Sequence, residues 1–479
     1  MTRFKNKDLK NNELYIALKQ LQNKRSYDTF DRFIISKMGF EVTGKVDDAL
    51  RRQAYKNFYS LIADQNISSR PTTKKWFGIN GFTIPKRYQI YRIAFALQLS
   101  IEDLQEWLTK GILEPGICYN DYSETIFCYG LENSLSYEEC CKMIEKFEQS
   151  ILDGPSFMHT HSTNQIASEF RMYKKIDKDS FMQWMITNAA WFKGYSMTTW
   201  DYINTYKKLI IEYIRQDTNK QLNSLLIETD FLSWLHRKRA FTSKKRSKLI
   251  QKYCLAYKKK QSSVENDVIL QTIMELNHIV ASDFGSNRMF LSELFGNNHA
   301  IAQLPHMSEK YLSDLLNQPF QKEKEIMIHL ALRELYSCKE NESCPNNIEK
   351  LIEEYSHKEL QDHSVENAKK QLEILRKEQT RRCLYVKRSD ILPMIHYVAQ
   401  RRYMDMITPT LNYNMSEARK QFIESANAIL LSCGMVKLDP DKYWLDAVFL
   451  ACFQKSEMYY YSDALEILEM DSEKKEEEK

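Results

Sequence analysis

Glycine and proline are scarce in this chain of 479 residues, which holds 12 Gly and 10 Pro. Proteins carry on average roughly 7% Gly and 5% Pro, and both residues disfavour the interior of a helix. Apolar residues recur mostly at spacings of three and four, with no sustained alternation of apolar and polar residues. Such spacing places apolar side chains on one side of a helix. We therefore predict an all-α protein.

Charge and cysteine content narrow the classes of protein that the chain can belong to. The formal net charge is only +4, so any contact with nucleic acid has to be local. The ten cysteines are scattered or adjacent and lack the CxxC spacing of zinc sites. They predict reduced thiols in a cytoplasmic protein without a bound metal. No run approaches 18 apolar residues, and the first residues lack the apolar core of a signal peptide, so we expect no membrane contact.

Four regions follow one another along the chain. Residues 1–150 contain helical segments broken by two loops, and the Gly-Pro pair in "LDGP" ends this region at Leu152–Pro155. Residues 151–375 indicate a central helical domain, and 376–465 a more apolar C-terminal helical domain. Residues 466–479, ending in "DSEKKEEEK", predict a disordered acidic tail.

The stretch "SSRPTTKKWFGINGFTIP", residues 68–85, predicts a short helix that follows another helix after a turn. Ser68 or Ser69 can cap the short helix, and Pro71 suits its first turn because its missing N–H would be unpaired there. The segment "TTKKWF" would expose small or basic side chains first and bury Trp76 or Phe77 near its end. Downstream, Pro85 is expected to begin a third helix and Ser100 to cap a fourth.

This order of segments, over roughly Tyr55–Leu108, resembles the helix-turn-helix domain of phage-repressor (Cro-like) regulators, also called the xenobiotic-response-element family. Long helical forms from Gram-positive bacteria and their mobile elements are the most similar. The resemblance implies an N-terminal helix-turn-helix domain followed by a large multi-helix region, with a helix around Thr72–Trp76 that reads double-stranded DNA. The DNA contacts it implies are Ser69, Arg70, Thr72, Thr73, Lys74, Lys75, Lys86 and Arg87. The loop between Trp76 and Pro85 is longer than usual in this family.

Two distant segments resemble each other. "LTKGILEPGICYNDYSETIFCYGLE" from Leu108 and "LLSCGMVKLDPDKYWLDAVFLACFQ" from Leu430 share a helix end, a glycine, a polar loop, an acid and an apolar helix. The acids are Glu124 and Asp446. We interpret the two segments as a repeated helix-loop-helix unit whose copies pack on each other or mediate dimerisation. The alternative is that loops of this kind simply join core helices.

A basic stretch at residues 236–260 lies within an acid-free run from Phe231 to Lys260. Cations of this density bind phosphates without reading sequence. The stretch therefore predicts backbone contacts, unless it forms a solvated helix surface or meets an acidic partner. The candidate residues are Arg237, Lys238, Arg239, Lys244, Lys245 and Arg246.

Motifs of enzymes are absent from the sequence, which has no GxxxxGK(S/T), GxGxxG, HExxH or GxSxG. We expect neither an enzyme nor a cofactor. Arg388 and His396 in "RSDILPMIH" resemble the Arg and His of helical RNases of the higher-eukaryote-and-prokaryote nucleotide-binding type. Their separation is longer than that motif usually allows, and a core histidine is the alternative.

Together these patterns predict a cytoplasmic DNA-binding regulator of a mobile element or defence locus. The alternative function is a helical scaffold or effector subunit whose helix-turn-helix contacts protein. A nuclease is the third hypothesis. Whether the chain forms a homodimer or binds a protein partner is left open by the sequence.

Overall fold

The fold is described from a computed structural model. It describes residues 12–24, 27–150, 163–192, 196–237, 246–258, 264–281, 286–296, 304, 306–339, 343–379, 385–407 and 412–477. Across these residues the chain forms 23 α-helices and no β-strand. Isolated β-bridges join Ser343 to Ser364 and Phe453 to Met458. The predicted all-α fold class is therefore confirmed.

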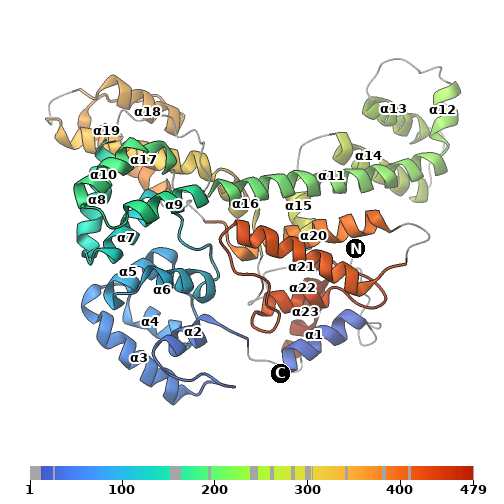
Figure 1. The fold of residues 1–479 in the computed structure, drawn as a ribbon. Coiled ribbons are helices and arrows are strands. Elements are labelled where there is room, and N and C mark those ends of the chain that lie inside the picture. The colour runs from blue at the N-terminus through green and yellow to red at the C-terminus, as the bar shows by residue number, and fades with distance from the viewer. Residues whose placement is uncertain are drawn as a thin grey trace. The chain divides into compact units, whose positions relative to one another are not determined.

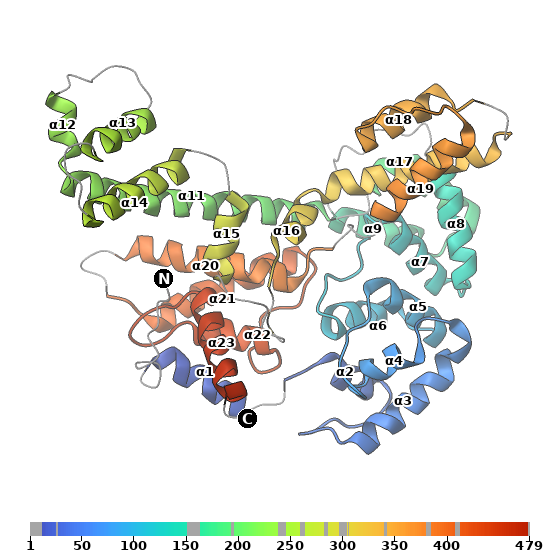
Figure 2. The same ribbon diagram turned by 180° about the vertical axis from the view of Figure 1, so that it is seen from behind.

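Contacts divide the chain into two compact units. The first contains Met1–Ile203 and Lys310–Tyr459, and the second contains Asn204–Glu309 and Tyr460–Lys479. Each unit thus joins segments that are distant in sequence, whereas the sequence suggested four consecutive regions. The helices of both units can be followed by colour and label in Figures 1 and 2.

The first unit is built from an N-terminal and a C-terminal group of helices. The N-terminal group is α1 (Glu13–Lys24), α2 (Phe30–Lys37), α3 (Asp48–Ile62), α4 (Arg70–Trp76), α5 (Arg87–Leu97), α6 (Ile101–Glu106), α7 (Tyr122–Glu132), α8 (Tyr137–Ser150), α9 (Thr163–Tyr173) and α10 (Lys178–Thr187). The C-terminal group is α16 (Glu309–Leu316), α17 (Gln318–Ser337), α18 (Asn346–Ser356), α19 (Val365–Gln379), α20 (Arg388–Met406), α21 (Met415–Ser432) and α22 (Trp444–Ala451).

The second unit contains α12 (Phe231–Arg237), α13 (Arg246–Lys258), α14 (Val264–Ala281), α15 (Ser286–Phe295) and α23 (Tyr461–Glu477). The long helix α11 (Met197–Glu228) begins in the first unit and continues in the second. Helix α23 corrects the prediction of a disordered tail from residue 466. Its residues Ile467 and Leu468 are 1% and 5% exposed, and this apolar contact extends the helix past the point where composition alone suggested disorder.

One apolar core joins helices α2 to α10 of the first unit. Phe58 of α3 meets Trp76 of α4 with ring centroids 6.3 Å apart. The same core continues beyond residue 150 through Phe181 and Phe192 and includes Ile326 of α17. A fragment that ends at residue 150 would cut through this core, which is a physical reason to place the end of a folding unit later in the chain.

The two segments with similar sequences pack on each other, as one of the two interpretations proposed. The Gly116 N–H donates a hydrogen bond of 2.9 Å to the Gly434 carbonyl. Each segment contributes the carboxylate of a buried arginine–carboxylate pair, and the two pairs have the same design. The carboxylate is the third residue of its helix, Glu124 in α7 and Asp446 in α22, and the arginine is the first residue of an earlier helix, Arg87 in α5 and Arg388 in α20.

The pair in the C-terminal segment shows how the arginine ties its loop together. Arg388 donates to both carboxylate oxygens of Asp446 at 2.6 Å and to the Val436 and Lys437 carbonyls at 3.2 Å. The Asp439 N–H donates to Asp446 Oδ2 at 2.7 Å. Arg388 and Asp446 are 2% and 0% exposed. A charged pair at this depth is stable only because every donor has an acceptor, so the loop before α22 is built around the arginine.

Candidate nucleic-acid interface

Helices α3 and α4 are joined by a short turn that α5 holds in place. The turn contains a 3₁₀ segment, Ala63–Gln65, and Asn66 with φ 48° and ψ 38°, a left-handed conformation that asparagine adopts readily. From α5, the Arg92 guanidinium donates to the Gln65 carbonyl at 2.6 Å, and the Gln89 amide donates to the Ile67 carbonyl at 3.5 Å. The orientation of α4 therefore depends on α5.

Capping and burial orient α4 as the sequence predicted. The Ser69 hydroxyl accepts a hydrogen bond from the Thr72 N–H, and a proline occupies the first turn. Trp76 is 0% exposed, which confirms its expected burial. The side chain of Thr73 is also 0% exposed, and its hydroxyl donates to the Arg70 carbonyl at 3.0 Å. The prediction that Thr73 contacts DNA is therefore wrong, because Thr73 lies on the same buried side of α4 as Trp76.

The outer side of α4 carries the cations. Arg70, Lys74 and Lys75 are exposed and Thr72 is half-buried, while Ser69 is exposed at the cap. Two of the cations lie over tyrosine rings of α3. The Arg70 guanidinium is 5.0 Å from the ring centroid of Tyr59 and donates to its hydroxyl at 2.7 Å.

The same tyrosine changes the protonation equilibrium of Arg70, since the hydrogen bond that Arg70 donates to the Tyr59 hydroxyl raises the pKa of this guanidinium. Lys74 Nζ lies 5.9 Å from the ring centroid of Tyr55. Such cation–π contacts stabilise a few positions of a long side chain. Two of the cations of α4, Arg70 and Lys74, are therefore partly ordered before any partner binds.

No acidic residue occurs between Asp64 and Glu102, a segment that spans α4, the loop after it and α5. Lys86, at the start of α5, is also exposed. The exposed side chains Arg70, Lys74, Lys75 and Lys86 thus lie in a part of the chain that supplies no carboxylate of its own. This local excess of positive charge is compatible with a small net charge for the chain as a whole.

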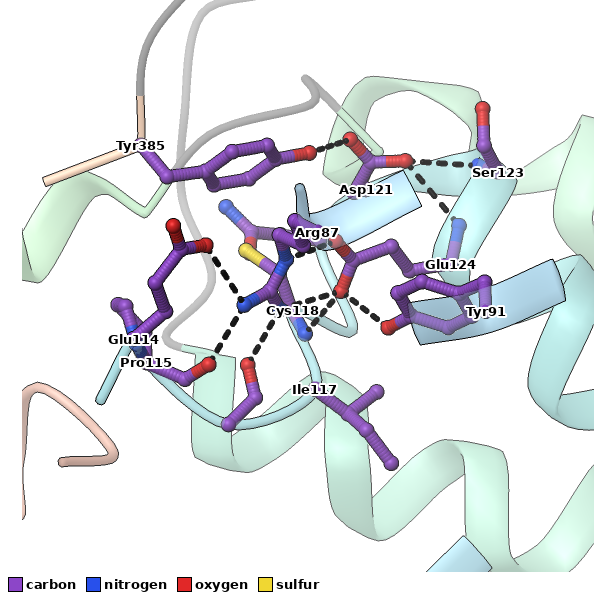
Figure 3. Close-up of polar contacts among 12 residues, drawn as sticks. Arg87, Tyr91, Glu114, Pro115, Ile117, Cys118, Asp121, Ser123, Glu124 and Tyr385 are labelled. Carbon is purple, nitrogen blue, oxygen red and sulfur yellow. Dashed lines mark hydrogen bonds and ion pairs between the residues drawn. The ribbon is translucent and has the colours of Figure 1, made fainter. Parts of the chain in front are cut away.

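Arg87 does not belong to the exposed cations, which corrects its predicted role as a DNA contact (Figure 3). It is 6% exposed. Its guanidinium donates to both carboxylate oxygens of Glu124 at 2.6 and 2.8 Å and to the Pro115 and Gly116 carbonyls at 2.6 Å. The Tyr385 ring lies 4.8 Å from the guanidinium carbon. Arg87 therefore holds Glu124 and the loop before α7 in place, and it contacts Tyr385 from the C-terminal part of the first unit.

Glu124 accepts two hydrogen bonds besides those from Arg87. The Tyr91 hydroxyl and the Cys118 N–H donate to Glu124 Oε2 at 2.6 and 2.8 Å (Figure 3). Burial alone would lower the pKa of Arg87, but the charge and hydrogen bonds of Glu124 raise it well above its usual value. Burial, followed by the charge of Glu124, raises the pKa of Tyr91 well above its usual value. The tyrosine therefore stays a hydrogen-bond donor, and the ion pair stays intact.

Tyr385, three residues before α20, links the first repeated segment to the C-terminal part of the first unit. Its hydroxyl donates to Asp121 Oδ2 at 2.9 Å, and Asp121 caps α7 (Figure 3). The neighbouring Lys387 forms an ion pair of 3.2 Å with Glu114. Through these contacts α5, which supports α4, is attached to the C-terminal group of helices.

Four of the six candidate residues of the basic stretch lie outside the described residues, namely Lys238, Arg239, Lys244 and Lys245. Of the two described candidates, Arg237 lies 3.7 Å from Asp230, and Arg246 donates to the Asn219 side chain at 2.8 Å and to Asn223. Both side chains remain exposed. Contact of this stretch with phosphates stays a prediction.

The two residues of the nuclease hypothesis are both buried. His396 is 0% exposed and lies among Phe422, Phe449 and Phe453, with ring centroids 5.0 to 5.3 Å apart. Burial lowers the pKa of His396 to about 3. A neutral core histidine and an arginine paired with Asp446 leave no accessible Arg–His site at this position.

The sequence analysis missed the arginine–carboxylate pairs, although a signal was present. Each repeated segment is preceded by Lys-Arg at a helix start, in "PKRYQ" and "VKRSD". It also missed the tyrosines of α3 that hold Arg70 and Lys74, because a cation–π contact between two helices leaves no trace at a fixed spacing.

Within the described ranges, no group of three or more His, Cys, Asp or Glu side chains could hold a metal ion. None of the helices in this part of the chain is both long and apolar enough to cross a membrane. Comparisons with protein-family models, with curated proteins and with solved structures gave no match.

Proposed function

We propose that the chain is a DNA-binding regulator in which α3 and α4 form a helix-turn-helix and α4 reads double-stranded DNA. The observation that carries the proposal is the two-sided character of α4. Thr73 and Trp76 are buried against the helices that support α4, while Arg70, Lys74 and Lys75 are exposed on its other side. A recognition helix needs this division, because one side has to pack and the other has to enter the major groove.

The exposed residues of α4 suit base edges and phosphates in different ways. Lysine and arginine donate to the O6 and N7 acceptors of guanine, and the threonine methyl group packs on the methyl group of thymine. We assign base contacts to Arg70, Thr72 and Lys74, and phosphate contacts to Ser69, Lys75 and Lys86. Thr73 and Arg87 are removed from the predicted set because both are buried.

The proposal also covers the cellular compartment and the role of the other helices. A regulator of a mobile element or defence locus acts in the cytoplasm, and the described cysteines suit a reducing compartment because none of them forms a disulfide. The helices outside α2–α6 would serve regulation or a partner. The alternative function remains a helical scaffold or effector subunit that uses α3 and α4 for protein contacts.

The test is selection of DNA by the full-length protein. A random duplex library is incubated with the protein at moderate salt, retained fragments are sequenced, and an enriched duplex is titrated. Lys74→Ala should lower affinity for the enriched duplex by about 1–3 kcal/mol for a base that is no longer bound. The matched control is Lys142→Ala, an exposed lysine of α8. Absence of enrichment, or equal effects of the α4 and α8 variants, would contradict the proposal and favour protein contacts.

A further inference from the structure

The loop between α4 and α5 exposes large apolar side chains beside the cations of α4. Phe82 and Ile84 are 52% and 48% exposed, and Tyr88 in the first turn of α5 is 55% exposed. Apolar side chains gathered on a surface indicate an interaction site more strongly than single exposed residues do. The loop lies between the labelled helices α4 and α5 in Figure 1.

The loop is held against α4 by its backbone. The Ile79 N–H donates to the Lys74 carbonyl at 3.1 Å, and the Thr83 N–H donates to the Lys75 carbonyl at 3.2 Å. Gly78 ends α4 with φ +70°, and a Cβ atom there would lie 2.0 Å from a guanidinium nitrogen of Arg51, so only glycine fits without a shift. Phe82 is therefore presented at a defined place next to α4.

The charge around these apolar side chains indicates the kind of partner. Lys75 precedes the loop and Lys86 follows it, both exposed, and no acidic residue occurs from 65 to 101. A hydrophobic protein surface would gain nothing from cations at both ends of the loop. Duplex DNA offers phosphates for the lysines and, between the phosphates, the apolar surfaces of deoxyribose and base edges.

We propose that the α4–α5 loop is a second DNA-contacting element, in which Phe82 and Ile84 pack on the sugar and base surface of the duplex while Lys75 and Lys86 bind the flanking phosphates. This inference rests on the proposed function. The contact of Phe82 and Ile84 with the duplex adds a contribution to affinity that does not depend on salt. Apolar contact releases no counterions, whereas each neutralised phosphate does.

The test compares salt dependence between variants of the full-length protein on one enriched duplex. Phe82→Ala should weaken binding by about tenfold, the effect of removing most of a phenylalanine contact, with an unchanged slope of log affinity against log salt. Lys75→Ala should instead reduce that slope by about 0.9 for each phosphate that is no longer neutralised. Ile84→Ala is a second, smaller truncation, and Met172→Ala on α9, where Met172 is 65% exposed, is the control for removal of an exposed apolar side chain.

Circular dichroism checks that the variants fold, which is expected because Phe82 is half exposed. If the parent binds the duplex and Phe82→Ala and Ile84→Ala bind equally well, the inference is wrong while the proposed function stands. If Phe82→Ala leaves affinity unchanged but alters the sedimentation of the protein, the loop contacts a second copy instead of DNA. If the parent enriches no duplex, both the inference and the proposed function are wrong.

Discussion

Replacement of Arg87 should have very different effects if this residue contacts DNA and if its role is structural. Replacing it with methionine removes four hydrogen bonds of 2.6 to 2.8 Å, two to Glu124 and two to the carbonyls of Pro115 and Gly116. It leaves the Glu124 carboxylate, 4% exposed, without its cation. Breaking a buried pair from one side costs about 3–5 kcal/mol. Because the Tyr91 hydroxyl and the Cys118 N–H still donate to Glu124, we expect a value near the lower end.

The loss of stability in Arg87→Met is measured locally, because a chain with two compact units does not unfold in one step. Hydrogen–deuterium exchange followed by mass spectrometry reports the opening of peptides from α5 and α7. We expect exchange there to accelerate by roughly two to three orders of magnitude in Arg87→Met, since each 1.4 kcal/mol is tenfold. The exposed Arg171 of α9 supplies the control variant Arg171→Met, which should change nothing.

A double variant separates the loss of the pair from the loss of volume. Arg87→Met together with Glu124→Leu replaces both charges by apolar groups and should restore most of the protection, as found when buried ion pairs are replaced as a unit. Suppose instead that exchange in α5 and α7 is unchanged in Arg87→Met while affinity for the enriched duplex falls. Arg87 would then face DNA, and the reasoning from the buried pair would be refuted.

Three further predictions concern other residues. Thr73→Val should leave the preferred DNA sequence unchanged, because Thr73 is buried; a changed preference in library selection would place its side chain in the groove. Neutralising Arg237, Lys238, Lys244, Lys245 and Arg246 together should weaken binding equally for all duplexes and make the salt slope shallower by about 0.9 for each phosphate that the stretch no longer neutralises; an unchanged slope would assign this stretch to protein or solvent. His396 has a folded-state pKa lowered to about 3, so its contribution to stability is present above the unfolded pKa of about 6.5 and is lost progressively as pH falls from there towards 3. In His396→Leu that part of the decline in urea midpoint with acidification should disappear, and an identical decline would show that other groups cause it.

Much of the local structure followed from short-range sequence. Ser69 and Ser100 cap α4 and α6, accepting hydrogen bonds from the N–H groups of Thr72 and Asp103. Both caps depend only on residues three positions apart, so the sequence is sufficient to predict them. The burial of Trp76 also followed from the local sequence, because tryptophan is highly buried on average and Trp76 follows a polar helix start.

The sequence by itself determined that the chain is helical and where α4 begins, since helix periodicity and caps are local properties. Only the tertiary structure decided which polar residues are available to a partner. Thr73 and Arg87 look like their more accessible neighbours, the half-buried Thr72 and the exposed Lys86, and what distinguishes them is the side of the helix that meets the core. For Arg87 that depends on Glu124 and Tyr385, which are 37 residues and nearly 300 residues away in sequence and reach it only in the folded chain. Buried charge needs a partner in space, and no pattern of neighbouring residues reveals one that folding brings from so far.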